Sequence, residues 1–411
     1  MIFRTIPDGW GIKKMPQVVK WGSGGTPKAT EKQYYDGGSI PWLVIGDLND
    51  SIVSFSASKI TELGLQNSSA KMIPAGTLLV AMYGSIGKLG ITGIECCTNQ
   101  AIAYAKELYG VTTKYMFFYM AMMKSELISK GKGGTQKNIS QTVLNSLEVI
   151  VPPLPEQERI VSRIEELFSQ LDAGVETLKK TKAQLAVYRQ AVLKEAFEGR
   201  LTASGREKIV RLGDYIETPR YGTSKKCSYD DGRDRTAVYR IPNIEHKNGR
   251  ISHDDIKYAQ FTESELDGIR LQQGDILIIR SNGSVSLVGR AAMVCDADIT
   301  GTFAGYLMRL RISEPETLLP KFLLLFLQSH QARIYIENKA KSTSGVHNIN
   351  STEISDLQMP LYDPDTQYAI IEAIESRLSV CDSIEQTVDT ALQQAEAMRQ
   401  SILKNAFEGR L

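Results

Sequence analysis

The sequence has few of the residues that build disulfide scaffolds and metal sites. Its 411 residues include five cysteines and four histidines. The cysteines are odd in number and form no C-x-x-C pair, and the histidines show no metal-ligand spacing. These absences argue against a disulfide framework and against a bound metal, and they suit a chain that works in a reducing cytoplasm.

Long apolar runs and an excess of one charge are also missing. The most apolar stretch, residues 115–123, is too short to cross a bilayer, and the first residues do not form the apolar run of a signal peptide. The formal net charge is only +1. Any surface that binds nucleic acid must therefore be a local one.

Three segments resemble catalytic motifs, and each of them lacks residues that the motif requires. Residues 84–89 look like a phosphate-binding loop, but that motif needs glycine in place of Met82 and serine or threonine in place of Leu89. Residues 151–154 share two prolines with an amino-methyltransferase motif and lack its polar and aromatic residues. Asp255 has no second acidic residue at a compelling spacing for a nuclease metal site. We therefore expect no catalytic residues, no metal site and no cofactor in this chain.

The sequence does contain a repeat. Residues 138–201 and 348–411 align without a gap at an offset of 210, with 22 identities in 64 positions. Both copies end in Ala-Phe-Glu-Gly-Arg-Leu. A repeat of this length divides the chain into two similar halves.

Each copy of the repeat predicts a long helix. Apolar residues step by threes and fours from about residue 155 to 198 and again in the second copy, and Gly199 and Gly409 end the two patterns. The expected seam residues are Ile160, Ile164, Leu167, Leu171, Val175, Leu178, Leu185, Tyr188 and Val192, then Ile370, Ile374, Leu378, Cys381, Ile384, Val388, Leu392, Ala395, Met398 and Ile402. Two matched seams favour pairing as a coiled coil. The alternative is an amphipathic helix that packs on its own domain.

The remainder of each half predicts a mixed α/β domain. In the first, we expect strands at 40–48, 73–88, 99–105 and 147–151, a helix at 114–129, and glycine-rich loops at 21–28 and 131–137. The second half repeats this order at 222–225, 239–244, 274–284, 321–326 and 344–349, with Gly222 in the place of Gly25. The expected fold class is α+β, with domains at 1–153 and 202–362 and long helices at 154–201 and 363–411.

With these features the chain resembles the specificity subunit of type I DNA restriction–modification systems over essentially its full length. The likeness rests on Ile40-Pro41-Trp42 and Gly46-Asp47-Leu48 after a Gly-Gly-Thr-Pro loop, the strand and turn at 76–88, Asn138-Ile139-Ser140, the proline-rich segment 152–160 and both Phe-Glu-Gly-Arg-Leu endings. The second copy departs from the proline-rich pattern at 359–367.

The resemblance implies two target-recognition domains, 1–153 and 202–362, each recognising half of a bipartite, asymmetric DNA sequence, with an antiparallel coiled coil between them. It implies double-stranded DNA, two modification (methyltransferase) subunits and restriction (translocase and nuclease) subunits as partners. S-adenosylmethionine, ATP and Mg would belong to those partners, and this chain would be a non-catalytic DNA-binding subunit. A coiled-coil scaffold whose globular domains bind protein partners is the alternative from a different class.

Candidate DNA contacts are hydrogen-bonding, basic and tyrosine residues on the expected loops and strand ends. In the first half they are Lys20, Ser23, Thr26, Lys28, Tyr34, Tyr35, Tyr83, Ser85, Lys88, Lys130, Lys132, Gln136 and Lys137, and in the second Arg220, Tyr221, Lys225, Lys226, Arg240, Asn243, Arg280, Asn282, Arg290 and His347. For each one, an ordinary solvated loop position is the alternative. The stretch 280–284 is the strongest candidate, because arginine suits guanine, asparagine suits adenine and glycine permits close approach.

Overall fold

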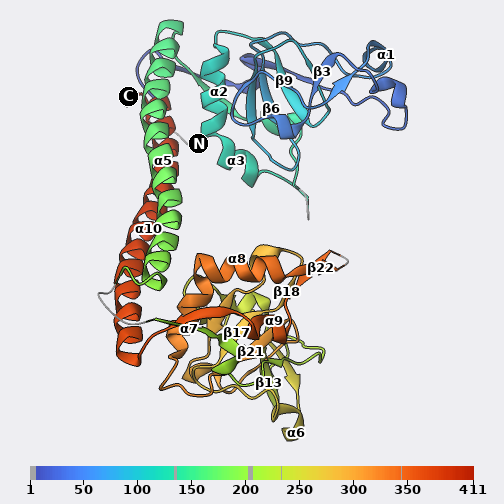
Figure 1. Ribbon diagram of the computed structural model, residues 1–411. Helices are drawn as coiled ribbons and strands as arrows, with labels where there is room; N and C mark the ends of the chain where they lie inside the picture. Colours follow the sequence, from blue (N-terminus) through green and yellow to red (C-terminus); the bar gives the residue numbers. More distant parts are fainter. Residues whose placement is uncertain (1–5, 134–136, 202–206, 233, 344) are drawn as a thin grey trace. The chain divides into compact units, whose positions relative to one another are not determined.

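The computed structural model describes residues 6–133, 137–201, 207–232, 234–343 and 345–411. The chain forms two compact units. Unit 1 comprises Met1–Leu178 and Asp389–Leu411, and unit 2 comprises Lys179–Val388. Both contain helices and sheets, which confirms the α+β class (Figure 1). The four-part division at 153, 201 and 362 stays a prediction.

Unit 1 is built on a five-stranded sheet of order β2-β9-β6-β7-β4. The strands are β1 (Gly11–Lys14), β2 (Val19–Ser23), β3 (Ile40–Leu43), β4 (Ser51–Val53), β5 (Lys59–Ile60), β6 (Leu78–Ala81), β7 (Leu89–Thr92), β8 (Cys97–Thr98), β9 (Ile102–Leu108) and β10 (Glu148–Val151). The helices are α1 (Glu62–Gln66), α2 (Thr113–Met122), α3 (Lys124–Ser129), α4 (Gln141–Asn145) and the first part of α5 (Leu154–Phe197). Strands β5, β3 and β8 form a smaller sheet, and β1 pairs with β10.

Unit 2 repeats this plan with a four-stranded sheet, β12-β21-β17-β19. Its strands are β11 (Lys208–Arg211), β12 (Arg220–Tyr221), β13 (Arg235–Tyr239), β14 (Ile244–Glu245), β15 (Arg250–Ile251), β16 (Lys257–Gln260), β17 (Ile276–Ile279), β18 (Ser281–Asn282), β19 (Ala291–Met293), β20 (Thr302–Phe303), β21 (Leu307–Leu310), β22 (Lys341–Thr343), β23 (Val346–Asn348) and β24 (Gln358–Leu361). Its helices are α6 (Glu263–Leu266), α7 (Pro320–Gln328), α8 (His330–Lys339), α9 (Ser351–Ser355) and the first part of α10 (Pro364–Phe407). The sheet β16-β13-β20 corresponds to β5-β3-β8, because the parallel pair β13–β20 matches β3–β8.

Three local predictions are corrected by the structure. Trp21–Ser23 belong to β2 rather than to a loop; Gly22 is needed there because a Cβ atom would lie 2.3 Å from the ring of Tyr104. The strand expected at 40–48 stops at Leu43, and a 3₁₀ turn follows at Ile45–Asp47, where the Val44 amide donates to the Asp47 carboxylate at 2.8 Å. The helix expected at 114–129 is divided into α2 and α3.

The correspondence between the two halves shifts by one residue at the glycine loop. The Gly25 amide donates to the Thr98 carbonyl, and the Thr223 amide donates to the Phe303 carbonyl, each at 2.8 Å. Thr98 and Phe303 hold equivalent places in β8 and β20. Gly222 therefore corresponds to Gly24, not to Gly25.

The long helices α5 and α10 each contain 44 residues and end as expected. Gly199 and Gly409 have φ angles of +70° and +69°, and the amides of Arg200 and Arg410 donate back to the carbonyls of Glu195 and Asn405. This is the Schellman arrangement, which favours glycine because its φ angle is positive.

Within each unit, early residues of one long helix meet late residues of the other. In unit 1, Ile160 and Ile164 share a core with Leu403 and Phe407, and Asp172 pairs with Arg399. In unit 2, Arg189 lies 3.1 Å from Glu385. Each helix also packs on the globular part of both units, and the pairing of the two helices as a coiled coil stays a prediction.

Most expected seam residues are buried or half-buried, and the prediction is wrong for three of them. Tyr188, Ile384 and Met398 are 48%, 40% and 54% exposed. A straight α-helix repeats every 3.6 residues, so a pattern of threes and fours drifts around the helix and brings some apolar side chains to its outer face. The sequence reasoning also missed the buried residues Val161, Leu193, Ala196, Phe197, Ile371, Leu403, Ala406 and Phe407.

Candidate nucleic-acid interface

The stretch 280–284 follows the buried strand β17 and pairs with the segment that carries His347. Ile279 is buried, Arg280 follows it, and the next two residues form β18, in which Ser281 lies opposite Asn348 and Asn282 lies opposite His347 of β23. Two stretches that the sequence selected separately are thus brought together. Asn282 accepts a hydrogen bond from the Ser284 amide, which holds the turn.

Arg280 is held in place by its neighbours. Its guanidinium carbon lies 4.3 Å from the centre of the Tyr221 ring, and its Nη1 donates to the Gly305 carbonyl at 3.1 Å. The Tyr221 hydroxyl accepts a hydrogen bond from the Ser351 amide at 3.1 Å. A stacked, half-buried arginine has little rotamer freedom left to lose on binding, which suits a side chain that recognises one base.

Arg240 is held by a carboxylate. Its Nη2 donates to Asp255 Oδ2 at 2.9 Å. Hydrogen bonds from Tyr229 and then Arg240 lower the pKa of Asp255. Asp255 is therefore used by an arginine and a tyrosine, and the described residues contain no group of three His, Cys, Asp or Glu side chains that could hold a metal ion.

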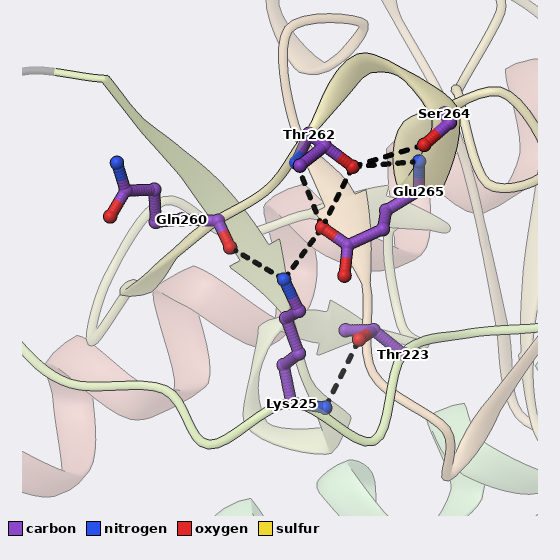
Figure 2. A network of polar contacts seen from close by, with 6 residues as sticks. All are labelled: Thr223, Lys225, Gln260, Thr262, Ser264 and Glu265. Carbon is purple, nitrogen blue, oxygen red and sulfur yellow. Dashed lines mark hydrogen bonds and ion pairs between the residues drawn. The ribbon is translucent and has the colours of Figure 1, made fainter.

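Lys225 lies in the network that Figure 2 shows. Its Nζ donates to Glu265 at 2.7 Å and to the Gln260 carbonyl at 2.9 Å, and its amide donates to the Thr223 hydroxyl. Glu265 also accepts from the Thr262 amide at 2.8 Å. The hydrogen bond from Lys225, followed by that of Thr262, lowers the pKa of Glu265 to about 2. The positive charge of Lys225 is therefore balanced by Glu265 within the fold.

These side chains border one cleft of unit 2, which we call the recognition cleft. It has a volume of about 670 Å³. Its polar lining includes Lys225, Arg240, Lys257, Arg280, Tyr306 and Asn348. Among the described residues, Arg240 Nε, Arg280 Nε and Asn348 Oδ1 are buried without a hydrogen-bond partner. The three unsatisfied groups belong to residues that line the same cleft.

The corresponding segment of unit 1 follows β6. Tyr83 forms an isolated bridge with Asn138, which also bridges to Lys132. Tyr83, Ser85, Lys132 and Lys137 are exposed and Lys88 is half-buried, whereas Gln136 lies outside the described residues.

The other candidates of unit 1 mostly have partners. Lys20 pairs with Glu107, Lys28 pairs with Glu31 and Lys130 pairs with Glu126. The Thr26 hydroxyl donates to Gln100, and the Tyr35 hydroxyl donates to the Pro27 carbonyl at 2.6 Å. Ser23 is exposed and Tyr34 is half-buried.

One candidate of unit 2 is corrected by the structure, and another lies away from the recognition cleft. Asn243 is fully buried; its side-chain nitrogen donates to the carbonyls of Ser252 and Asp254, and its oxygen accepts from the Arg240 amide, so it cannot contact a base. Arg290 does not border the recognition cleft and lies in a separate cavity. Arg220 and Lys226 are exposed, and His347 is half-buried.

Sequence reasoning missed three residues of the cleft. Lys257 lies with its Nζ 4.6 Å from the centre of the Tyr229 ring, Tyr306 is 63% exposed, and Asn348 lies on β23. Gly305 beside Tyr306 was the available signal, since glycine next to an exposed aromatic marks a turn that can approach a ligand.

Comparison with known proteins shows similarity to one family along the whole chain. Residues 7–186 match the type I restriction modification DNA specificity domain. Similarity to several type I restriction enzyme specificity subunits extends over both halves of the chain.

Two relatives are the EcoKI specificity subunit of Escherichia coli (strain K12), 25% identical, and the StySPI specificity subunit of Salmonella potsdam, 24% identical; each match covers 99% of this chain and 90% of the relative. A solved chain described as "Structural basis underlying complex assembly and conformational transition of the type I R-M system" has the same fold, with a TM-score of 0.77, 16% identity and coverage of 99% of this chain and 100% of that one. The HsdS subunit from Thermoanaerobacter tengcongensis gives a TM-score of 0.54 at 16% identity, with coverage of 99% and 98%.

No helix among the described residues combines the length and apolar character needed to span a membrane.

Proposed function

We propose that this chain recognises a bipartite, asymmetric sequence in double-stranded DNA and gives that specificity to partner adenine methyltransferase and restriction subunits. The observation that carries the proposal is the recognition cleft, which is lined by Arg280, Arg240 and Asn348 and in which both arginines are held by neighbouring groups. Arginine and asparagine are the side chains best suited to hydrogen-bond guanine and adenine edges.

The domain at 202–362 would recognise one half-site through this cleft, and the domain at 1–153 the other half-site through the loops around Tyr83, Ser85 and Lys132. In this proposal the remaining exposed candidates, such as Arg220, Lys226 and Lys137, contact DNA phosphates, because basic side chains on loops position a protein on the duplex without selecting a sequence.

We further propose that α5 and α10 form an antiparallel coiled coil between the two recognition domains. The local pairs Asp172–Arg399 and Arg189–Glu385 support this order, since residue numbers rise along one helix as they fall along the other. Cysteines introduced at 164 and 402 should cross-link efficiently. Efficient linking of 164 to 374 would instead mean that the helices run parallel.

The proposed partners are two modification subunits and the restriction subunits. S-adenosylmethionine, ATP and Mg are assigned to those partners rather than to this chain, which would act without catalytic residues of its own in the cytoplasm. The names of the relatives support this role as a specificity subunit.

DNA binding by the purified chain tests the proposal. Binding to a random duplex should weaken steeply between two salt concentrations, because each neutralised phosphate releases counterions. With modification subunits added, the double substitution of Arg280 and Asn282 by alanine should weaken methylation at sites defined by one half-site, by about 1–3 kcal/mol for each lost base contact. Arg270→Gln, on an exposed arginine paired with Glu263, is the matched control. Absence of salt-dependent DNA binding would favour the protein-binding scaffold instead.

A further inference from the structure

A second cavity of unit 2 gathers cationic side chains away from the recognition cleft. It has a volume of about 380 Å³ and is lined by residues of α5, α7, α8 and α10, of the turn after β14 and of the segment from the loop after β18 to the start of β19. Its charged side chains are Arg189, Lys247, Arg290, Arg333 and Glu337, and His246 lies among them. We call it the cationic cavity.

The carboxylates near this cavity already form ion pairs with basic side chains. Glu337 lies 2.8 Å from Arg333, Glu385 lies 2.7 Å from Lys247, and Asp382 and Glu385 both pair with Arg189. Arg290 has no carboxylate partner among the described residues. Its Nε donates to the Ser286 carbonyl at 3.0 Å, and its Nη1 lies 2.7 Å from Nε2 of His246.

The arrangement is unfavourable for further positive charge. Nη1 of Arg290 lies 3.0 Å from Nδ1 and 2.7 Å from Nε2 of His246, and a guanidinium this close disfavours the protonated ring. Burial, followed by the charges of Arg290, Arg333 and Lys247, lowers the pKa of His246, and burial together with Arg333 lowers the pKa of Arg290. An anion placed here would relieve this repulsion.

Unit 1 contains a cavity at the equivalent place with a different charge. Five lining positions correspond at the offset of 210: Ala186, Arg189, Gln190, Leu193 and Leu378 match Glu396, Arg399, Gln400, Leu403 and Phe168. In unit 1 the charged lining residues are Asp50, Lys124, Glu396 and Arg399, two of each sign, and Lys124 pairs with Asp50 at 3.1 Å. The cationic character therefore belongs to unit 2 and is not a consequence of the repeated fold.

The cationic cavity adjoins the stretch 280–284 through one short loop. The Ser286 carbonyl accepts from both Arg290 and Arg333, and the Ser286 hydroxyl lies 3.0 Å from that of Ser284. Gly289 brings the loop against α8; its φ angle is +84°, and a Cβ atom there would lie 2.6 Å from Ile336. The arginines thus join the loop that carries the strongest base-recognition candidates to a fixed helix.

We propose that the cationic cavity binds a phosphate group, with Arg290 as its main ligand, Arg333 and Lys247 beside it, and His246 taking up a proton as the anion arrives. Arginine is suited to such a site because its planar fork can hold two phosphate oxygens. The phosphate would come either from the DNA backbone next to the half-site or from free phosphate. The DNA source rests on the proposed function, whereas the anion site itself does not.

The first arm of the test uses inorganic phosphate and the full-length chain. With only four histidines, the ring signals can be assigned by single His→Asn substitutions and followed by NMR at several pH values. Phosphate should raise the pKa of His246, whereas the ring signals of His330, which does not line the cavity, should not respond to phosphate. Arg290→Gln should weaken phosphate binding about tenfold, the effect of losing one charge-assisted hydrogen bond. Arg290→Lys should restore part of it.

The second arm uses DNA. Arg290→Gln should reduce the slope of the logarithm of DNA affinity against the logarithm of salt concentration by about 0.9, the contribution of one phosphate. Lys124→Gln, in the equivalent cavity of unit 1, and Arg270→Gln provide controls of equal charge. Thermal unfolding checks that each variant is folded.

The outcomes separate the sources. Changes in both arms support a DNA phosphate; a change in the first arm alone supports a free phosphate site and excludes the DNA source. If a folded Arg290→Gln protein differs from the wild type in neither arm, or if phosphate leaves the pKa of His246 unchanged, the anion site is excluded. A chain that binds no DNA would contradict the proposed function while the first arm still decides the site.

Discussion

In unit 1, Phe407 packs edge-on against the rings of Tyr115 and Tyr119, and in unit 2, Phe197 does the same against Phe322 and Phe326. Each phenylalanine ends a long helix whose first residues belong to the other unit. In contrast, the stretch 280–284 of unit 2 differs in sequence from the segment around Tyr83 in unit 1, and the cationic cavity of unit 2 differs in charge from the equivalent cavity of unit 1. The repeated parts hold the fold, and the parts that differ are free to determine what each unit binds.

A buried glutamine makes equivalent hydrogen bonds at the start of each long helix, so this part of the repeat is also the same in the two units. Gln157 donates to the carbonyls of Gly110 and Pro152 and accepts from the Thr112 amide; Gln367 donates to the carbonyls of Thr317 and Tyr362 and accepts from the Leu319 amide. Both side chains are fully buried. The second copy keeps this arrangement although its proline-rich pattern is lost.

Removing the second half of the chain is the most severe test of the equivalence of the two units. A fragment of residues 1–201 lacks Leu403, Ala406 and Phe407, which complete the core of unit 1. Its own Leu193, Ala196 and Phe197 are identical at the offset of 210. We therefore expect two copies to exchange these ends and form a symmetric dimer, measured by light scattering. With modification subunits it should direct methylation to a palindromic site, because a two-fold protein requires a two-fold target.

The control for this experiment is Phe197→Ala in the same fragment, residues 1–201. This change removes the side chain that would replace Phe407, so the dimer should dissociate more readily, at protein concentrations where the unsubstituted fragment is still dimeric. A stable monomer of the unsubstituted fragment, or methylation that still follows the asymmetric sequence, would contradict the equivalence of the two helix ends.

Removing one aromatic ring should affect one unit at a time. Phe407→Ala should destabilise unit 1, and Phe197→Ala unit 2, each by about 4 kcal/mol, because a buried ring is lost and a cavity remains. Hydrogen exchange of the full-length chain, followed separately in the two units, measures the effect. Met398→Ala, at an exposed position, should change little. An equal loss of protection in both units after either substitution would show that the rings do not act locally.

Replacing the two buried glutamines should destabilise the two units by a smaller amount, which should be similar in both. Gln157→Leu and Gln367→Leu leave two carbonyls and one amide without partners, and each should cost about 3 kcal/mol in its own unit. The same hydrogen-exchange measurement applies, with Gln358→Leu on an exposed strand position as the control. A large effect at Gln157 and none at Gln367 would indicate that the lost proline pattern had changed the role of the second glutamine.

Periodicity and the repeat predicted the class of the fold and the extent of both long helices, because apolar spacing and terminal glycines are local signals. They did not predict the burial of Phe197 and Phe407 against the globular cores, which depends on residues far away in the sequence. For the same reason Asn243 resembled a base contact, although its partners, the carbonyls of Ser252 and Asp254, leave it no free donor. The pairing of 281–282 with 347–348 was likewise invisible until the strands were placed.

The smallest expected effect concerns two lysines that the sequence placed in equivalent loops. Lys28 makes an exposed pair with Glu31 at 3.3 Å, whereas Lys225 is tied to Glu265 and the Gln260 carbonyl. Because its pKa is lowered to about 2, Glu265 supports this network fully above its ordinary pKa of 4.5, and the support is lost as the pH falls from 4.5 towards 2. Glu265→Leu removes the acceptor of the Thr262 amide and should therefore expose that amide to faster hydrogen exchange at neutral pH, while Glu31→Leu changes its own loop little. Equal changes in the two loops would mean that Lys225 is as mobile as Lys28, and that the recognition cleft of unit 2 is no better ordered than its counterpart in unit 1.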